Sequence, residues 1–167
     1  MGYNEHKHLS PASIDCAVVI VSDSRTEKDD LSGDFIVKSL TENGHRVVSR
    51  CILKNEADSV QSIVDDLVNE DNLQVVIISG GTGVSHRDVT VETVTPMLDK
   101  KMDGFGELFR RLSYEEIKTG CIMSRALAGV INGRVVICLP GSLGAVTLAM
   151  KQIILPEMGH MVREATR

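Results

Sequence analysis

A glycine-rich loop followed by charged residues is the part of this chain best suited to chemistry. The β-branched run at residues 75–79 predicts a buried parallel strand, and Gly-Gly-Thr-Gly follows directly at residues 80–83. Glycine allows backbone N–H groups to approach a ligand that side chains would block. Arg87 and Asp88 come next, where open α/β sheets place their binding sites. The segment therefore predicts an anion-binding loop with an acid and a base built in.

A second glycine turn follows another predicted strand. The apolar run 134–139 ends in Pro140, Gly141 and Ser142. Two such turns at one sheet edge would form a crevice into which N–H groups point, so we expect a phosphate ester as ligand. The first loop is neither a P-loop nor the dinucleotide fingerprint, because the required lysine and glycine spacing are missing. An ordinary strand-to-helix turn remains the alternative for either loop.

The charged residues after the glycine loop favour a functional reading. Arg87 can pair with phosphate oxygens through its planar guanidinium, and Asp88 can hold Mg²⁺ together with substrate phosphates. The alternative is a surface ion pair capping the helix that starts near Thr90. Further carboxylates, which are expected either at the same edge or as caps and loop residues, follow the first strand: Asp23, Asp30 and Asp34.

Serines near the two predicted strand ends have two readings as well. Ser124, followed by Arg125, precedes a strand by a short gap, and Ser142 starts a helix. As helix or turn caps they need no further role. As phosphate ligands they would face the same crevice.

Hydrophobic periodicity predicts the elements that position these residues. Apolar runs indicate strands at 16–22, 45–53, 74–79 and 134–139. Helical spacing and stop signals predict helices that start near Ser32 and end at Asn43-Gly44, and at 56–70, 90–99, 104–118, 143–155 and from Pro156 onward. Strands that alternate with helices indicate crossover connections and a mostly parallel sheet covered on both faces.

Two helices carry features of their own. Pro96 lies inside the predicted helix 90–99 and is expected to shorten or bend it. Thr90 is its expected cap. The helix 104–118 carries Phe105 and Phe109 on one face, which indicates either core packing or contact with another subunit.

Composition sets the broad class. The chain has 167 residues, 43% of them hydrophobic and 25% charged, which is ordinary for one globular domain. A net charge of −5 argues against nucleic-acid binding. No apolar run reaches the ~18 residues of a membrane helix, and the polar N-terminus lacks the apolar core of a signal peptide, so we expect a cytoplasmic protein without a membrane partner. The four scattered cysteines are expected to be reduced.

The first thirteen residues differ from the rest. They are polar and include His6 and His8, a spacing that nothing nearby completes into a metal site. We expect residues 1–13 to form a flexible tail and residues 14–167 to form the folded domain.

Four ordered motifs resemble one known family. The chain is similar to the molybdopterin-binding domain of molybdenum cofactor biosynthesis proteins, the MoaB/Mog group, over about residues 15–160. The motifs are Gly-Gly-Thr-Gly with Arg-Asp-Val-Thr at 80–90, Gly-Phe-Gly-Glu-Leu-Phe-Arg with Leu-Ser-Tyr-Glu-Glu-Ile at 104–117, Ser-Arg-Ala with Ala-Gly at 124–129, and Leu-Pro-Gly-Ser at 139–142.

This resemblance implies a fold, an assembly and a reaction. The fold would be a three-layer α/β/α sandwich with a largely parallel sheet, assembled as a homotrimer or homohexamer. The activity would be molybdopterin adenylyltransferase: with Mg²⁺ and ATP, the terminal phosphate of molybdopterin attacks the α-phosphate, which releases pyrophosphate. A later-step enzyme would insert molybdate or tungstate, and the sequence does not say which.

The resemblance also implies roles for individual residues. Asp88 and Arg87 would be catalytic. Molybdopterin would be bound by Gly80, Gly81, Thr82, Gly83, Ser124, Arg125, Gly141 and Ser142. The nucleotide would be flanked by Ser22, Asp23, Gly81 and Pro140.

The expected metal residues depart from the family pattern. Members usually carry an acidic pair after the second strand, where this chain has Asn55 and Glu56. The expected metal residues are therefore Asp88, Asn55 and Glu56, with Asp58 as a further substitute. Other departures are Val91 in place of proline and Ser142-Leu143 in place of Asn-Pro. The alternatives are a non-catalytic molybdopterin-binding or scaffold protein, and a nucleotide-binding α/β enzyme with an unrelated substrate.

Overall fold

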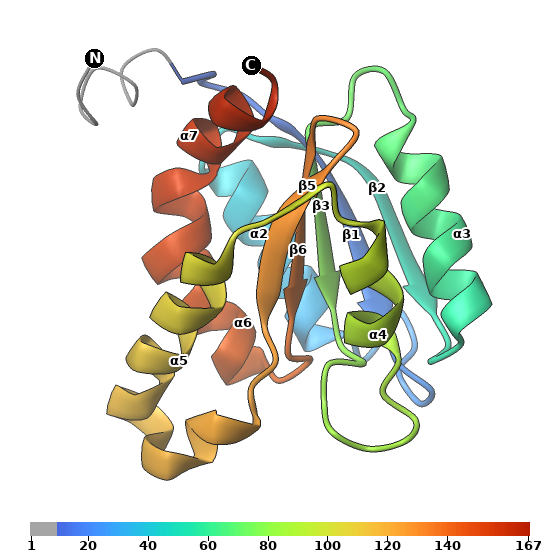
Figure 1. Cartoon of the computed structure of the whole chain (residues 1–167), viewed down its shortest axis with the longest axis vertical. Coiled ribbons are helices and arrows are strands. Elements are labelled where there is room, and N and C mark those ends of the chain that lie inside the picture. The colour runs from blue at the N-terminus through green and yellow to red at the C-terminus, as the bar shows by residue number, and fades with distance from the viewer. Residues whose placement is uncertain (1–9) are drawn as a thin grey trace.

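A six-stranded sheet forms the centre of the protein, in a computed structural model that describes residues 10–167 (Figure 1). The strand order is β2-β1-β3-β6-β5-β4. Neighbours from β2 to β6 pair in parallel, whereas β5 runs antiparallel to both β6 and β4. The strands are β1 (Asp15–Val21), β2 (Arg46–Leu53), β3 (Val75–Ser79), β4 (Lys100–Lys101), β5 (Leu127–Ile131) and β6 (Arg134–Leu139).

Helices cover both faces of this sheet, which confirms the predicted α/β/α layering. One face packs against α2, α5, α6 and α7, and the other packs against α3 and α4 (Figure 1). The helices are α2 (Leu31–Glu42), α3 (Ala57–Val68), α4 (Thr90–Val94), α5 (Asp103–Ile117), α6 (Leu143–Ala149) and α7 (Leu155–Ala165). Short helical turns are η1 (Thr95–Met97), η2 (Lys118–Met123) and η3 (Met150–Ile154).

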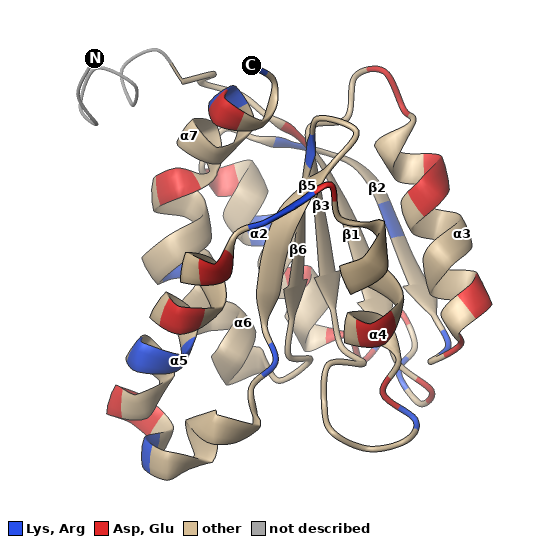
Figure 2. Ribbon diagram, in the orientation of Figure 1, with Lys and Arg blue, Asp and Glu red and all other residues tan. Residues whose placement is uncertain are grey.

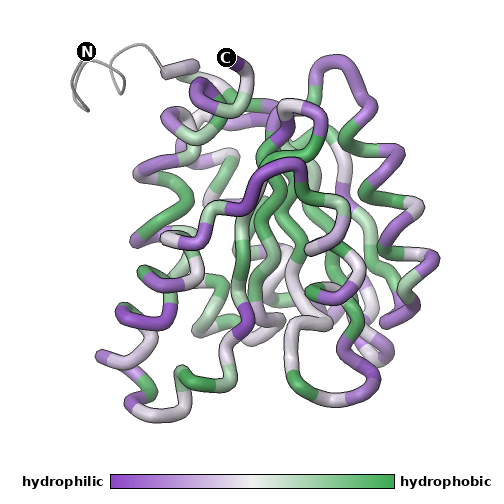
Figure 3. Tube along the Cα trace, in the orientation of Figure 1, coloured by the Kyte–Doolittle hydropathy of each residue, from purple (hydrophilic) through white to green (hydrophobic). Residues whose placement is uncertain are grey.

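The alternation of side chains along β1 divides the core into two halves. Val18 and Ile20 join the half beneath α2, while Val19 and Val21 join the half beneath α3. Because both faces are covered, every residue of β3 is buried, and the central strands form a continuous hydrophobic band (Figure 3). This two-sided burial explains why the sequence shows apolar runs without alternation.

The register of the sheet brings three strand ends together. Ile20 of β1 lies beside Ser79 of β3, which in turn lies beside Leu139 of β6. The loops that follow these strands therefore start from one edge of the sheet. Away from the hydrophobic core, the surface of α3 is acidic, since this helix carries three aspartates and no basic residue (Figure 2).

The sequence pattern does not predict the two strands β4 and β5. The small-residue segment near 124–130 contains β5, which joins β6 through a hairpin and not through a helix. Asn132 and Gly133 both have positive φ, 49° and 74°, as a two-residue hairpin turn requires. The Asn-Gly pair was the sequence signal for this turn.

Helix boundaries also differ from the predictions at three places. Asp30, and not Ser32, caps α2 by accepting the N–H of Gly33. Val89 occupies the cap position of α4. The helix break expected at Pro156 is absorbed by the π-helical turn η3, because a wider turn accommodates a proline that lacks the N–H donor.

Other predictions hold within the described residues. α4 ends at Val94, and Pro96 lies in the 3-10 turn η1 that follows, so this helix is shortened as expected. All four cysteines are free. No helix in residues 10–167 is long and apolar enough to cross a membrane.

The predicted tail and the phenylalanine face have different outcomes. Most of the tail, with His6 and His8, lies outside the described residues, although Ser13 donates a hydrogen bond to the carbonyl of Gly44. Phe105 and Phe109 are 5% and 1% exposed and belong to the protomer's own core. The core reading of these two side chains is therefore correct, and their proposed contact with another subunit is not.

Candidate functional site

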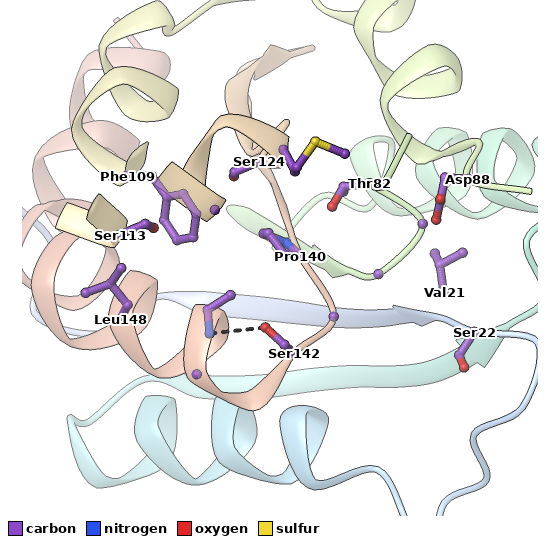
Figure 4. A pocket seen from close by; sticks show the side chains of 18 of the residues that line it. Val21, Ser22, Thr82, Asp88, Phe109, Ser113, Ser124, Pro140, Ser142 and Leu148 are labelled. Atoms are coloured by element: carbon purple, nitrogen blue, oxygen red, sulfur yellow. Dashed lines mark hydrogen bonds between the residues drawn. The ribbon is translucent and has the colours of Figure 1, made fainter. Parts of the chain in front are cut away.

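A cavity of about 700 Å³ opens at the sheet edge where β1, β3 and β6 end. Figure 4 shows its two sides: Ser22, Thr82 and Asp88 lie on one, and Phe109 and Leu148 lie on the other. Of the residues predicted from sequence, those that line the cavity are Ser22, Asp23, Asn55, Gly80, Gly81, Thr82, Gly83, Asp88, Ser124, Pro140, Gly141 and Ser142. Four other predicted residues do not line it, namely Arg87, Arg125, Glu56 and Asp58.

The first glycine turn is folded tightly onto the end of β1. Gly80 and Gly81 have positive φ, 106° and 66°, a conformation that glycine adopts without strain. A Cβ on Gly80 would lie 2.1 Å from the carbonyl oxygen of Val21. Thr90 secures the turn by donating its hydroxyl to Gly80 O (2.8 Å) and its N–H to Gly81 O (2.9 Å). Glycine is therefore required here by both conformation and space.

The second glycine turn lies against the first. A Cβ on Gly141 would be 3.3 Å from the Cα of Gly80. Ser142 caps α6, since its hydroxyl accepts the N–H of Ala145 at 3.4 Å (Figure 4). The cap reading of Ser142 is thus correct, and the same residue also lines the cavity. The two turns form the paired edge that the sequence predicts.

Asp88 is half-buried beside the first glycine turn. One carboxylate oxygen accepts the N–H of Ser85 at 3.0 Å. A Cβ on Gly83 would approach this oxygen to 2.6 Å, so the glycine leaves the space that the carboxylate occupies. Asp88 is in this way held against the loop while it faces the cavity.

Arg87 pairs with Asp23 and not with its neighbour Asp88. Its Nη2 and Nε donate to one Asp23 oxygen at 2.8 and 3.2 Å, and the N–H of Asn55 donates to the other at 3.0 Å. The hydrogen bonds from Arg87 and then from Asn55 lower the pKa of Asp23, and the same pair raises the pKa of Arg87. Asp23 therefore joins three loops of the cavity wall.

Arg125 holds the glycine loop from outside the cavity. Its Nε donates to Thr82 O at 3.0 Å, and its Nη2 donates to Gly83 O. The same guanidinium pairs with Glu92 on α4 and lowers the pKa of that carboxyl group. A direct contact between Arg125 and a bound molecule stays a prediction, since the side chain is committed to the loop and to Glu92.

The two residues expected in place of an acidic pair are separated. Asn55 lines the cavity, and its buried amide oxygen has no hydrogen-bond partner within residues 10–167. A Cβ on Gly81 would lie 2.5 Å from this oxygen. Glu56 is exposed at the start of α3, where its carboxylate accepts the hydroxyl of Ser59 at 3.3 Å.

Sequence reasoning missed one wall of the cavity and one cation. The wall comes from α5, η2 and α6 and includes Phe109, Ser113, Met123 and Leu148. Ser113 is 4% exposed on an otherwise apolar helix face, and this buried hydroxyl was the available signal. The cation is Arg25, whose loop gave no periodic pattern.

The cavity lining carries more acidic than basic side chains, so an anionic ligand needs a cation to bind there. Within the described residues, Asp23, Asp88 and Glu116 face the cavity as acids, and Arg25 is the one base. No group of three His, Cys, Asp or Glu residues in the described chain is arranged to hold a metal alone. A divalent cation at Asp88 would need further oxygens from the ligand, which is how Mg²⁺ is usually held with phosphates. The donor set therefore fits Mg²⁺ bound jointly by protein and ligand.

Comparison with known proteins points to one family. The sequence model of a family described as "Probable molybdopterin binding domain" matches residues 17–160. A Bacillus cereus protein named "Molybdenum cofactor biosynthesis protein B" is 45% identical over 168 residues, with 100% of this chain and 99% of the relative covered. The protein of the same name from Bacillus subtilis is 46% identical, with 98% and 97% covered.

Solved structures agree with the sequence relatives. A crystal structure of a molybdenum cofactor biosynthesis protein B superposes with a TM-score of 0.90 at 45% identity, covering 93% of this chain and 98% of that one. The tungsten cofactor synthesizing protein MoaB from Pyrococcus furiosus superposes with a TM-score of 0.87 at 34% identity, covering 95% and 100%.

Proposed function

Because this chain belongs to the molybdopterin-binding domain family, in its MoaB group, we propose that it acts in molybdenum or tungsten cofactor biosynthesis as a molybdopterin adenylyltransferase. In this reaction a terminal phosphate oxygen of molybdopterin forms a bond to the α-phosphorus of ATP. The bond between the α- and β-phosphates breaks, and pyrophosphate leaves. Family membership argues against the alternative of a nucleotide-binding enzyme whose substrate is unrelated to molybdopterin.

One observation carries the proposal. Asp88, both glycine turns, Ser124 and Ser142 line a single cavity, although they come from separate parts of the chain. Transfer between phosphates requires mainly that the two reactants are positioned and their charge is neutralised. Backbone N–H groups at the turns favour phosphate oxygens, and a cavity of about 700 Å³ is within the usual range for small-molecule sites.

The acidic lining supports a requirement for Mg²⁺. Two phosphorylated reactants would meet Asp23, Asp88 and Glu116 against one arginine, so a cation is needed to offset the repulsion. Bound Mg²⁺ would supply charge neutralisation and orientation at the reacting phosphates. Asp88 would hold it, Asn55 would offer a neutral oxygen if its amide turned toward the cavity, and Glu56 is a weaker candidate because it lies outside.

The remaining side chains have positioning roles in this proposal. Ser124 and Ser142 would contact the phosphate of molybdopterin, and Ser22 and Pro140 would flank the nucleotide. Ser22 also shapes its own loop, because its hydroxyl accepts the N–H of Arg25 at 3.1 Å. Arg87 would keep the loop before α4 against the β1 edge through Asp23.

The test is pyrophosphate release from purified protein, molybdopterin, ATP and Mg²⁺. We expect wild type to release pyrophosphate only when all components are present. Asp88→Asn should reduce the rate by about 100-fold or more if it removes the carboxylate that holds Mg²⁺. Asp65→Asn, an equal charge change on the exposed face of α3, serves as the control. An Asp88→Asn variant as fast as wild type would refute the assigned role.

A non-catalytic molybdopterin-binding role is the second candidate. Asn55 is neutral at the cavity, and Asp23 is already engaged by Arg87 and Asn55, which leaves Asp88 as the main carboxylate for a cation. This candidate predicts that molybdopterin binds while no pyrophosphate appears. Pyrophosphate above the background of the Asp88→Asn variant excludes it.

We propose a homotrimer or homohexamer as the assembly. With Phe105 and Phe109 in the core, exposed apolar side chains of α5 and η2 that do not line the cavity are the better candidates for the contact, namely Leu108, Tyr114 and Ile122. Light scattering at micromolar protein tests the proposal, and a mass equal to the 18.2 kDa protomer would contradict it. A later-step enzyme that inserts the metal is a proposed partner.

A further inference from the structure

Three arginines surround the cavity, and their carboxylate contacts differ. Arg87 donates two hydrogen bonds to Asp23, and Arg125 pairs with Glu92 while it holds two loop carbonyls. Arg25 instead lies 3.9 Å from a carboxylate oxygen of Asp30. When an arginine is bonded directly to a carboxylate, the carboxylate offsets its positive charge, and fewer of its N–H donors are free for a ligand.

Asp30 holds Arg25 near the cavity without neutralising it through a hydrogen bond. The Asp30 carboxylate is fully buried. One of its oxygens accepts the N–H of Gly33 at 2.9 Å, and the other accepts Nη2 of Arg50 at 2.8 Å. Arg50 also donates to Asp34. The direct bonds of this carboxylate are thus made by α2 and β2, and its attraction to Arg25 acts over a longer distance.

The guanidinium of Arg25 lies where the two glycine turns meet. Its Nη2 donates to Gly141 O at 2.7 Å. A Cβ on Gly141 would lie 3.6 Å from Nη1 of Arg25 and 3.3 Å from the Cα of Gly80. A guanidinium has five N–H donors in a planar fork, and the bond to Gly141 uses one of them. The side chain is 30% exposed and lines the cavity.

We propose that Arg25 is the cation of this site that binds a phosphate group of the ligand, seated between the turns at Gly80 and Gly141. It is the one basic residue that lines the cavity within the described chain. The N–H of Gly80 itself donates to Leu139 O at 2.9 Å, so the guanidinium supplies the charge-assisted donors of this site. Arg87 and Arg125 keep their roles in holding the loops. The inference rests on the proposed function only for the identity of the phosphate.

Binding is measured by calorimetry without catalysis, using three probes: pyrophosphate, ATP with Mg²⁺, and molybdopterin. We expect Arg25→Gln to weaken at least one probe by about 10- to 100-fold, because a charge-assisted hydrogen bond is lost. Arg25→Lys should restore part of this loss. The affected probe shows whether the phosphate belongs to the nucleotide or to the pterin.

Two control variants separate ligand binding from loop support. Ser32 also donates to Gly141 O, at 2.9 Å, and does not line the cavity, so Ser32→Ala removes similar support without removing charge. Lys38→Gln makes the same charge change on an exposed part of α2. Both controls should bind within about twofold of wild type.

Three results would overturn the inference. They are a Ser32→Ala loss as large as that of Arg25→Gln, full affinity in Arg25→Gln, and a wild type that binds none of the three probes. A different result would refute only the proposed reaction: wild type binds a probe, Arg25→Gln weakens that binding, and yet wild type releases no pyrophosphate.

Discussion

Arg87 and Asp23 form an ion pair across 64 positions of sequence, with Nη2 of the arginine 2.8 Å from a carboxylate oxygen. The pair joins the loop after β3 to the loop after β1, and both loops border the cavity. The adjacent Arg87 and Asp88 therefore differ in position: the arginine joins the two loops, and the aspartate faces the cavity. The consequence is that substitutions at these neighbours should fail in different ways.

The first prediction concerns this pair. Arg87→Gln should raise KM for ATP more than it lowers kcat, because it loosens a wall and leaves Asp88 in place. Asp23→Asn should do the same, and the double variant should be little worse than either single variant, since both remove one interaction. Steady-state kinetics measure this, and fully additive losses would show that the two side chains act independently.

The pair also predicts a pH dependence of stability. The folded pKa of Asp23 lies below its ordinary value of 3.8. A lowered folded pKa contributes stability that is present above pH 3.8 and is lost as the pH falls through the folded value. The urea midpoints of wild type and Arg87→Gln should therefore differ near neutral pH, and the difference should shrink as the pH falls below 3.8. A difference that stays constant with pH would contradict this origin.

The glycine turn predicts a stability loss that is specific to position. Gly81→Ala should lower the free energy of unfolding by at least about 1–2 kcal/mol, the cost of a left-handed alanine. The actual loss should be larger, because the new Cβ would lie 2.3 Å from Oγ1 of Thr90. Gly104→Ala is the matched control, since nothing lies within 4 Å of its Cβ. Urea unfolding compares the two, and equal stabilities would refute the steric argument.

Arg125 predicts a loss of turnover without a loss of fold. Arg125→Gln frees the carbonyls of Thr82 and Gly83, so we expect kcat to fall by about tenfold or more through misplacement of the loop. Glu92→Gln should have a smaller effect, because the bonds from Arg125 to the carbonyls remain. Pyrophosphate release and circular dichroism are the readouts. Unchanged turnover in Arg125→Gln would show that the loop does not need this support.

Cysteine reactivity tests the burial of the sheet. Burial raises the pKa of Cys16 and of Cys138 to about 12. At pH 8 roughly one thiol in ten thousand would be ionised at that pKa, so iodoacetamide should leave both unmodified in the folded protein. In urea all four cysteines should react, as mass spectrometry of peptides would show. Rapid modification of Cys138 in the folded state would contradict the buried position.

The sequence by itself determined the elements that depend on local pattern. Two-sided burial produces apolar runs such as that of β3, and three glycines at 80–83 end it, so the strand, its turn and the glycine-turn side of the cavity were predictable. The helix stripe of α3 was predictable for the same reason. The Asn-Gly turn at residues 132–133 carried a signal as well, although the strand before it is too rich in small residues to show a clear pattern.

The tertiary structure alone decided which charges meet. Asp23 pairs with Arg87 at a distance of 64 residues, and Arg25 reaches Gly141 over 116 residues. Neither contact produces a periodic pattern in the sequence. The residues lie in loops, and their partners come close only when the sheet has formed. Sequence neighbours suggested that Arg87 acts with Asp88, whereas the fold gives Arg87 to the wall and places Arg25 at the cavity. The order of the strands determines these positions of Arg87 and Arg25, because parallel pairing gathers the ends of β1, β3 and β6 at one edge of the sheet.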